Sequence, residues 1–387
     1  MKRLTEFLLK GHIAPMNSQS NILQRTPLFD EHVRLNARMV PFAGWEMPIQ
    51  YRGVTEEHLS VRRQVGLFDV SHMGEIRVRG PFAQKTLQWL TTNDVSKLQA
   101  GQAQYSLLPN ATGGIVDDII VYCLEPNLDY LVCVNAANIE KDWQWMNHHN
   151  QGAELINESS HWAQIAVQGP EAIKLLQTVW GNEVSTLRPF QFARLHFKNE
   201  VCLLARTGYT GEGGGEIFIP ADLAVALWQE LMAHGERLNV QPIGLAARDT
   251  LRLEMKYCLY GNDIDDTTNP YEAGLGWVVK PLAKDFVGKT HVMAGKEQLS
   301  RRWIGFELID RGVPRSGYEL YSFDNAKIGK VTSGTMSPSL QKPIGVAYVP
   351  IELSELGSQF YVEIRGKKVR AQVVKTPFVS PMTTEKE

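Results

Sequence analysis

The sequence lacks several features that mark common classes of protein. Its 387 residues include only four cysteines, with no Cys-x-x-Cys pair and no histidine at ligand spacing, so neither a zinc site nor a disulfide framework is expected. We expect these cysteines to be reduced and packed in the interior. No apolar run approaches the roughly 18 residues of a membrane-spanning helix. The 40 Lys and Arg against 42 Asp and Glu leave a net charge of −2, which provides no basic excess for nucleic acid. We therefore expect no metal, no membrane and no nucleic-acid partner.

The N-terminus also lacks a convincing targeting signal. The apolar run Phe7-Leu8-Leu9 is too short for a secretory signal, and Glu6 is atypical of a transit peptide. We expect residues 1–25 to form a disordered extension, the alternative being that translation starts at Met16. The expected location is the cytoplasm, or the mitochondrial matrix if the source is eukaryotic.

The sequence does contain an internal repeat. Residues 76–88 (IRVRGPFAQKTLQ) and 165–177 (IAVQGPEAIKLLQ) agree at eight of 13 positions. In each copy a short alternating strand leads to a glycine turn and a proline in the first turn of a helix, where its missing N–H costs nothing. The repeat predicts two related α+β modules, the alternative being chance similarity between two strand–helix units.

Other patterns organise the rest of the chain. The β-rich runs 114–124 and 129–136 predict an antiparallel hairpin, followed by a helix from about residue 139 with Asn138 as its cap. Residues 245–257 have helical periodicity. From residue 302 onwards, short strand-like runs recur about every ten residues, which predicts a small all-β barrel or sandwich.

Two adjacent carboxylates are candidate functional residues. Asp117 and Asp118 lie inside the strongest predicted strand, so their side chains must point to opposite faces. Both faces are otherwise apolar, and burial of an unpartnered carboxylate costs several kcal/mol. One of them could be a charge at a sheet edge or a ligand of a turn. A strand carboxylate that lines a cavity is instead a candidate for acid–base chemistry or ligand anchoring.

The remaining polar motifs are less specific. The glycine-rich segment 206–216 (RTGYTGEGGGE) is neither a Walker loop nor a dinucleotide fingerprint, and it predicts a hairpin before a strand at 217–219. Glu216 and Arg248 could be solvated charges, or could offer an acceptor and a donor fork to a flat heterocycle. The segment 69–72 holds an Asp, a Ser and a His too close together for a catalytic triad.

Taken in order, these motifs closely resemble the T-protein family, the aminomethyltransferases of the glycine cleavage system. The resemblance runs from about Thr26 to Phe378. The matching stretches are TPLF from residue 26, FAGWEMP from 42, GLFDVSHMGE from 66, GGIVDD from 113, VNAAN from 134, RTGYTGE from 206, GLAARD from 244 and YGND from 260.

The resemblance implies an α+β cloverleaf of three domains around a central folate cavity, with two related α+β modules and a C-terminal β-barrel. The expected domains are residues 26–66 with 161–280, then 67–160, a linker at 281–301, and the barrel at 302–387. The implied substrates are tetrahydrofolate and an aminomethyl group on the lipoyl arm of the partner H-protein, and the products are ammonia, methylene-tetrahydrofolate and the dihydrolipoyl carrier. The family's catalytic aspartate falls on Asp118. Folate contacts are implied for Met73, Tyr105, Asn135, Tyr209, Glu216 and Arg248.

Other functions exist on the same fold. Folate-binding maintenance proteins for iron–sulfur enzymes carry Lys-Gly-Cys-Tyr-x-Gly-Gln-Glu, whereas residues 256–263 read KYCLYGND, which keeps Cys258 but loses Gly-Gln-Glu. Sarcosine and dimethylglycine oxidases add a flavin domain with a GxGxxG fingerprint, which this chain lacks. A non-catalytic folate-binding scaffold remains an open alternative.

Overall fold

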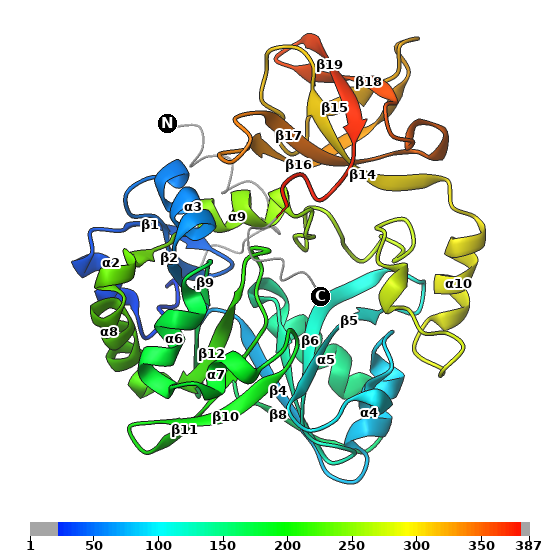
Figure 1. Cartoon of the computed structure of the whole chain (residues 1–387). Coiled ribbons are helices and arrows are strands. Elements are labelled where there is room, and N and C mark those ends of the chain that lie inside the picture. Colours follow the sequence, from blue (N-terminus) through cyan, green and yellow to red (C-terminus); the bar gives the residue numbers. More distant parts are fainter. Residues whose placement is uncertain (1–21, 381–387) are drawn as a thin grey trace.

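Two large β-sheets, a small two-stranded sheet and a closed barrel make up the fold of residues 22–380, the part of the chain that this computed structural model describes (Figure 1). Most of the predicted N-terminal extension, residues 1–21, lies outside the described residues, as does the tail after residue 380. Within 22–380 every helix is too short or too polar to cross a membrane. The four cysteines are all free and buried, which confirms their predicted state.

A five-stranded antiparallel sheet has the order β5-β6-β7-β4-β8. The predicted hairpin is confirmed as the pair β6–β7, and the predicted helix as α5. Apolar side chains of α4 and α5, such as Leu87 and Met146, pack in the core of this sheet. The strands of this sheet and the helices packed on it are β4 (Gly74–Arg79), α4 (Ala83–Leu90), β5 (Gln102–Pro109), β6 (Ile115–Glu125), β7 (Asp129–Val134), α5 (Ile139–His148) and β8 (Glu154–Asn157).

A six-stranded sheet has the order β10-β11-β12-β9-β3-β13 and is antiparallel except for the pair β13–β3. Leu175 of α6 and Trp228 of α8 belong to its core, and β1–β2 form a separate small sheet. The elements are α2 (Phe29–Arg34), β1 (Arg38–Phe42), β2 (Trp45–Gln50), α3 (Val54–Arg63), β3 (Gly66–Asp69), β9 (Trp162–Gln168), α6 (Ala172–Trp180), α7 (Glu183–Thr186), β10 (Phe192–Phe197), β11 (Glu200–Ala205), β12 (Gly214–Pro220), α8 (Ala224–His234), β13 (Gln241–Pro242) and α9 (Leu245–Glu254).

The two copies of the sequence repeat occupy equivalent places in the two sheets. The first copy forms β4 and α4, and the second forms β9 and α6. The order β5-β6-β7-β4 in one sheet corresponds to β10-β11-β12-β9 in the other. The prediction of two related α+β modules is thereby confirmed. Because β3 lies wholly in the six-stranded sheet, we propose that the second module begins after Asp69 rather than at residue 67.

The two sheets share an apolar interface. Tyr122 of β6 lies edge-on to Phe192 of β10 and Phe218 of β12, with ring centroids 5.7 and 5.2 Å apart. All three side chains are buried in one cluster. This contact places one face of β6 towards the six-stranded sheet, and the same face carries Asp118 because side chains alternate along a strand.

The C-terminal part is a closed barrel with the order β14-β17-β16-β15-β18-β19. The strand spacing predicted a barrel or a sandwich, and the barrel is the form that the family resemblance implied. Figure 1 shows it above the two sheets, next to α9. The chain between α9 and the barrel contains α10 (Lys289–Glu297). The barrel strands are β14 (Arg301–Leu308), β15 (Glu319–Tyr321), β16 (Lys327–Met336), β17 (Pro343–Pro350), β18 (Gln359–Ile364) and β19 (Lys367–Val374).

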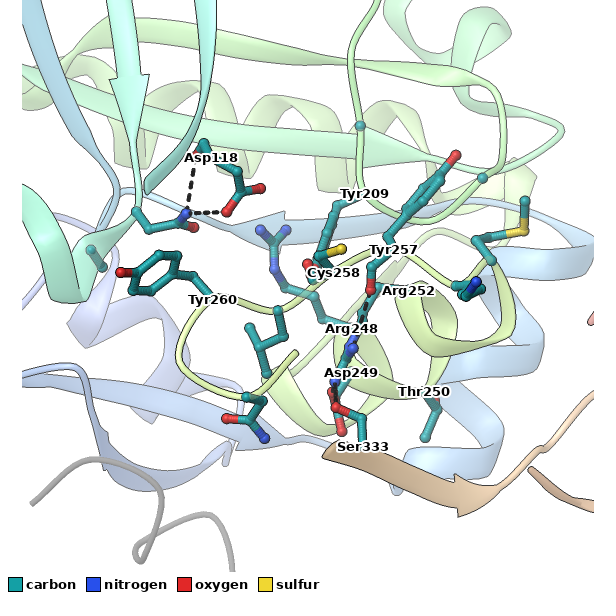
Figure 2. A pocket seen from close by; sticks show the side chains of 18 of the residues that line it. Asp118, Tyr209, Arg248, Asp249, Thr250, Arg252, Tyr257, Cys258, Tyr260 and Ser333 are labelled. Carbon is teal, nitrogen blue, oxygen red and sulfur yellow. Dashed lines mark hydrogen bonds and ion pairs between the residues drawn. The ribbon is translucent and has the colours of Figure 1, made fainter. Parts of the chain in front are cut away.

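Buried polar contacts attach α9 to the barrel. Arg252 donates to Asp263 at 2.6 Å and to Ser333 of β16 at 2.9 Å. Glu254, at the end of α9, accepts a hydrogen bond of 2.5 Å from Ser337. Since a buried charge without a partner is strongly unfavourable, these pairs fix the barrel against α9 in one arrangement. Figure 2 shows Arg252 beside Asp249 and Ser333 at the cavity wall.

Candidate functional site

A cavity of about 2400 Å³ lies where the two sheets, α9 and the barrel meet (Figure 2). Sites for drug-sized ligands typically enclose roughly 300–1,000 Å³, so this cavity has room for a large ligand and a second reacting group. The residues predicted as site residues all line it. They are Met73, Tyr105, Asp118, Asn135, Tyr209, Glu216 and Arg248.

Asp118 enters the cavity from the middle of β6. Its carboxylate accepts hydrogen bonds from the Tyr105 hydroxyl and from the side-chain amide of Asn135, each at 3.0 Å. Burial, followed by the negative charge of Asp117, raises the pKa of Asp118 to about 7 even though these hydrogen bonds act in the opposite direction. Asp118 can therefore change its charge near neutral pH.

Asp117 points to the other face of β6, as strand alternation predicted. Its carboxylate accepts the Asn135 backbone N–H and side-chain N–H, both at 2.9 Å, and the Asn138 side-chain N–H at 2.7 Å. Asn138 is the residue before α5, but its side chain makes no capping hydrogen bond, so the predicted cap is wrong. The side chain instead donates to the buried Asp117 carboxylate, because a buried carboxylate without donors is strongly unfavourable.

Glu216 and Arg248 provide one anion and one cation to the same cavity. Thr207 donates to one Glu216 oxygen at 2.5 Å, while the other oxygen accepts no hydrogen bond from a residue in 22–380. Burial raises the pKa of Glu216. The Arg248 guanidinium makes no hydrogen bond to the described residues and lies over the Tyr209 ring, 4.8 Å from its centroid. Its five N–H groups are thus left for a ligand.

The glycine-rich segment brings Glu216 to this position. It joins β11 to β12, which confirms the predicted hairpin, but β12 begins at Gly214 rather than at residue 217. Gly214 has φ +140°, and a Cβ there would lie 2.0 Å from the Val167 carbonyl oxygen. Only glycine fits this close approach to β9, and it places Glu216 within the strand.

Aromatic side chains form flat walls around these polar groups. Tyr105 stacks on Trp277, with ring centroids 5.9 Å apart and an interplanar angle of 16°. Tyr209 stacks on Tyr257, also at 5.9 Å, and its hydroxyl donates to the Cys258 carbonyl. Trp277 is 60% exposed, so one face of this large apolar ring is open to solvent at the cavity. Such surfaces suit a planar ligand.

Several lining residues were missed from the sequence. Trp277 lies in a single 3-10 turn, Gly276–Val278, which is too short to show periodicity, so no local pattern marks it. His72 was considered only as part of a triad, yet its buried Nδ1 has no hydrogen-bond partner in 22–380 and its ring lines the cavity. Burial, followed by the charge of Arg248, lowers the pKa of His72 to about 4, so this ring is neutral at pH 7. The charge of Asp69 acts in the opposite direction but does not outweigh these effects, and the Asp69 carboxylate itself is hydrogen-bonded to His32 at 2.8 Å.

The site has no recognisable metal centre within residues 22–380, where no group of three His, Cys, Asp or Glu side chains could hold an ion. The arrangement instead consists of a carboxylate that titrates near neutrality, an anion, an uncommitted guanidinium and stacked aromatic rings. These groups can bind a planar heterocycle with hydrogen-bonding edges and stabilise positive charge next to it.

Comparisons with known proteins agree along almost the whole chain. Family models match over residues 28–282, the "GCVT N-terminal domain", and over residues 301–380, the "Glycine cleavage T-protein C-terminal barrel domain". An aminomethyltransferase of Bdellovibrio bacteriovorus is 57% identical over 359 residues, which cover 92% of this chain and 100% of the relative. One of Bacteroides thetaiotaomicron is 49% identical over 360 residues, with 92% and 99% covered. The solved structure of glycine cleavage system aminomethyltransferase T from Bartonella henselae is 35% identical, with a TM-score of 0.87, and the match covers 93% of this chain and 99% of that one.

Proposed function

The chain belongs to the aminomethyltransferase (T-protein) family of the glycine cleavage system, and from this premise we propose how its cavity carries out the transfer. It is an aminomethyltransferase, as the sequence motifs predicted. We propose that its one-carbon acceptor is tetrahydrofolate and that its donor is the aminomethyl-lipoyl arm of H-protein. The relatives are bacterial, and we propose a cytoplasmic location for the enzyme.

One observation carries the assignment of the site. Residues from separate segments of the chain bring an uncommitted guanidinium (Arg248), a carboxylate with a free oxygen (Glu216) and a titrating carboxylate (Asp118) into one cavity. A reduced pteridine presents an N–H next to an amino group on one edge and a carbonyl oxygen on another. Glu216 can accept the first pair, and Arg248 can donate to the second. Met73, Tyr105 and Tyr209 offer soft or flat surfaces to the ring.

The proposed reaction moves one carbon from the lipoyl arm to tetrahydrofolate. The bonds of this carbon to the lipoyl sulfur and to the amino nitrogen break, and two bonds to nitrogens of tetrahydrofolate form. The two protons that these nitrogens lose pass to the sulfur and to the departing amine, which yields methylene-tetrahydrofolate, the dihydrolipoyl arm and ammonia. Most of the acceleration comes from holding the reactants in register, which can contribute roughly 7–11 kcal/mol. The size of the cavity, about 2400 Å³, leaves room for the carrier arm beside the pteridine.

Asp118 supplies the electrostatic stabilisation that accelerates the transfer. In its ionised form it orients the attacking nitrogen and stabilises the positive charge that builds on that nitrogen and on the transferred carbon. Tyr105 and Asn135 fix the carboxylate in place through their hydrogen bonds of 3.0 Å. A pKa of about 7 means that a cationic donor entering the cavity shifts Asp118 towards its ionised form.

An ammonia-release assay tests this function. Lipoylated H-protein loaded with the aminomethyl group is mixed with the enzyme, with and without tetrahydrofolate. Folate-dependent release of ammonia together with methylene-tetrahydrofolate is expected. Tight folate binding without release would instead identify a scaffold, and it would remove the catalytic assignment of Asp118.

A further inference from the structure

Behind Asp118, on the opposite face of β6, two carboxyl groups are buried together, and they lie within side-chain hydrogen-bond distance of each other. Asp117 of β6 and Asp142 in the first turn of α5 have no exposed surface. Neither forms an ion pair with a cation in the described part of the chain. Both oxygens of Asp142 are buried and receive no hydrogen bond from residues 22–380. Nothing in the reaction described above uses this pair.

Two adjacent buried carboxyl groups cannot both be ionised without severe repulsion, so the pair retains one proton. Asp117 accepts three N–H groups, from Asn135 twice and from Asn138, so both of its oxygens already serve as acceptors. Asp142 has no such donor, and burial, followed by the charge of Asp117, raises its pKa well above the ordinary value. The shared proton therefore belongs on Asp142, whose O–H can be donated to Asp117.

Asn135 connects this pair to the cavity. Its side-chain amide donates to Asp117 at 2.9 Å and to the Asp118 carboxylate at 3.0 Å. It also lies 3.1 Å from the Asp118 backbone oxygen. Two N–H hydrogens are thus divided among three acceptors, and the share that reaches the Asp118 carboxylate depends on how strongly Asp117 attracts the amide.

We propose that Asp142, in its carboxylic acid form, is a positioning residue that donates to Asp117 and so leaves Asn135 free to orient the Asp118 carboxylate. This inference rests on the proposed function, because it assigns Asp142 a part in the same reaction. Asp142 does not touch the cavity itself. It acts through Asp117 and Asn135, by supplying the donor that Asp117 would otherwise draw from Asn135.

Other titratable groups face this cluster. Those that act on Asp142 are Asp117 and Asp118 of β6 and Lys141 of its own helix, and Tyr260 faces the same group from the segment after α9. Those around Asp118 are Asp117, Tyr105, Tyr209 and Cys258. Lys141 does not neutralise Asp142, since its amine donates to the Tyr260 hydroxyl at 2.7 Å and lies 3.6 Å from Asp266.

Two substitutions of nearly the same size test whether the side chain at position 142 acts as a hydrogen-bond donor or only fills space. Asp142→Asn keeps an N–H donor towards Asp117 and adds no charge, so kcat and the midpoint of the pH–rate profile should match the wild type. Asp142→Leu removes the donor, and we expect kcat to fall roughly tenfold, the factor typical of one lost hydrogen bond to a charged group, with KM for tetrahydrofolate changed less than twofold. Glu140→Gln, an exposed change on the same helix, is the control.

The results can overturn the proposal in several ways. A wild-type kcat in folded Asp142→Leu would remove Asp142 from the positioning role. A fall of the pH midpoint by half a unit or more in Asp142→Asn would mean that Asp142 is ionised, because the substitution would then have removed a charge.

If the leucine variant does not fold, the infrared difference spectrum of wild type minus Asp142→Asn decides between the two protonation states of Asp142. A carbonyl band of a buried carboxylic acid at neutral pH is expected, and its absence contradicts the proposal. This band needs no turnover, so failure of the proposed function alone leaves it unaffected.

Discussion

Replacement of Asp118 by asparagine is the most informative change to the site. The amide has nearly the same size, and its oxygen can still accept the hydrogen bond that Tyr105 donates at 3.0 Å. The negative charge of Asp118 is lost, whereas Glu216 and Arg248, the proposed pteridine contacts, are untouched. We therefore expect Asp118→Asn to bind tetrahydrofolate nearly as well as the wild type but to turn over slowly.

The size of the effect follows from electrostatics. A unit positive charge about 4 Å from a carboxylate at the edge of a protein cavity is stabilised by about 4 kcal/mol at an effective dielectric constant of about 20. Part of this stabilisation already exists in the ground state, since the donor is cationic, and only the difference accelerates the reaction. Loss of one preorganised electrostatic group typically lowers kcat by about 10²–10³-fold. We expect a decrease in this range for Asp118→Asn.

The assay measures ammonia and methylene-tetrahydrofolate from loaded H-protein under single-turnover conditions, so that product release does not mask chemistry. Folate binding is followed separately by quenching of tryptophan fluorescence, since Trp277 lines the cavity. Glu125→Gln removes an exposed charge from the same strand and is the matched control. Turnover by Asp118→Asn within twofold of the wild type at saturating folate would refute the electrostatic role of this residue.

Three further predictions concern Asp118, Glu216 and the buried Glu254 at the end of α9. Because the acting form of Asp118 is the carboxylate and its pKa is about 7, kcat/KM should rise with pH through a midpoint near 7, and Asp118→Asn should abolish this step. Glu216→Gln replaces an acceptor by a donor against the ligand N–H groups, so isothermal titration should show folate binding about 10–100-fold weaker, and unchanged affinity would exclude this contact. Burial acts to raise the pKa of Glu254, but hydrogen bonds from His58 and Ser337 outweigh it and hold the pKa at about 2, against 4.5 ordinarily. Glu254→Gln should therefore lose about 3 kcal/mol in urea unfolding at neutral pH, and the difference should vanish as the pH falls from about 5 towards 2, whereas a constant difference would contradict this origin.

Much of the local structure could be predicted from the sequence. Period-two alternation was enough to place Asp117 and Asp118 on opposite faces of one strand. The repeat at 76–88 and 165–177 predicted the two related sheets. The alternation is a local signal, because a strand fixes side-chain direction residue by residue. The assignment of Asp118 rather than Asp117 to the cavity came from the family resemblance, since alternation alone does not say which face meets a cavity.

Other features depended on tertiary contacts that a local pattern does not contain. Asn138 was predicted as a helix cap, but a buried carboxylate on another element competes for its side chain. Trp277 owes its position to stacking on Tyr105, which is far away in sequence. The unpaired carboxyl of Asp142 looks like an ordinary acidic residue in the first turn of a helix, where such residues are favoured. Only the packing of α5 against β6 shows that it is buried.

The structure of the enzyme crystallised with tetrahydrofolate tests the central claim most directly. We predict that the pteridine lies in the cavity with its amino edge on Glu216 and its carbonyl oxygen towards Arg248, and that a folate nitrogen comes within hydrogen-bond distance of the Asp118 carboxylate. A pteridine bound elsewhere, or one held in the cavity with Asp118 turned away from every folate nitrogen, would contradict the account.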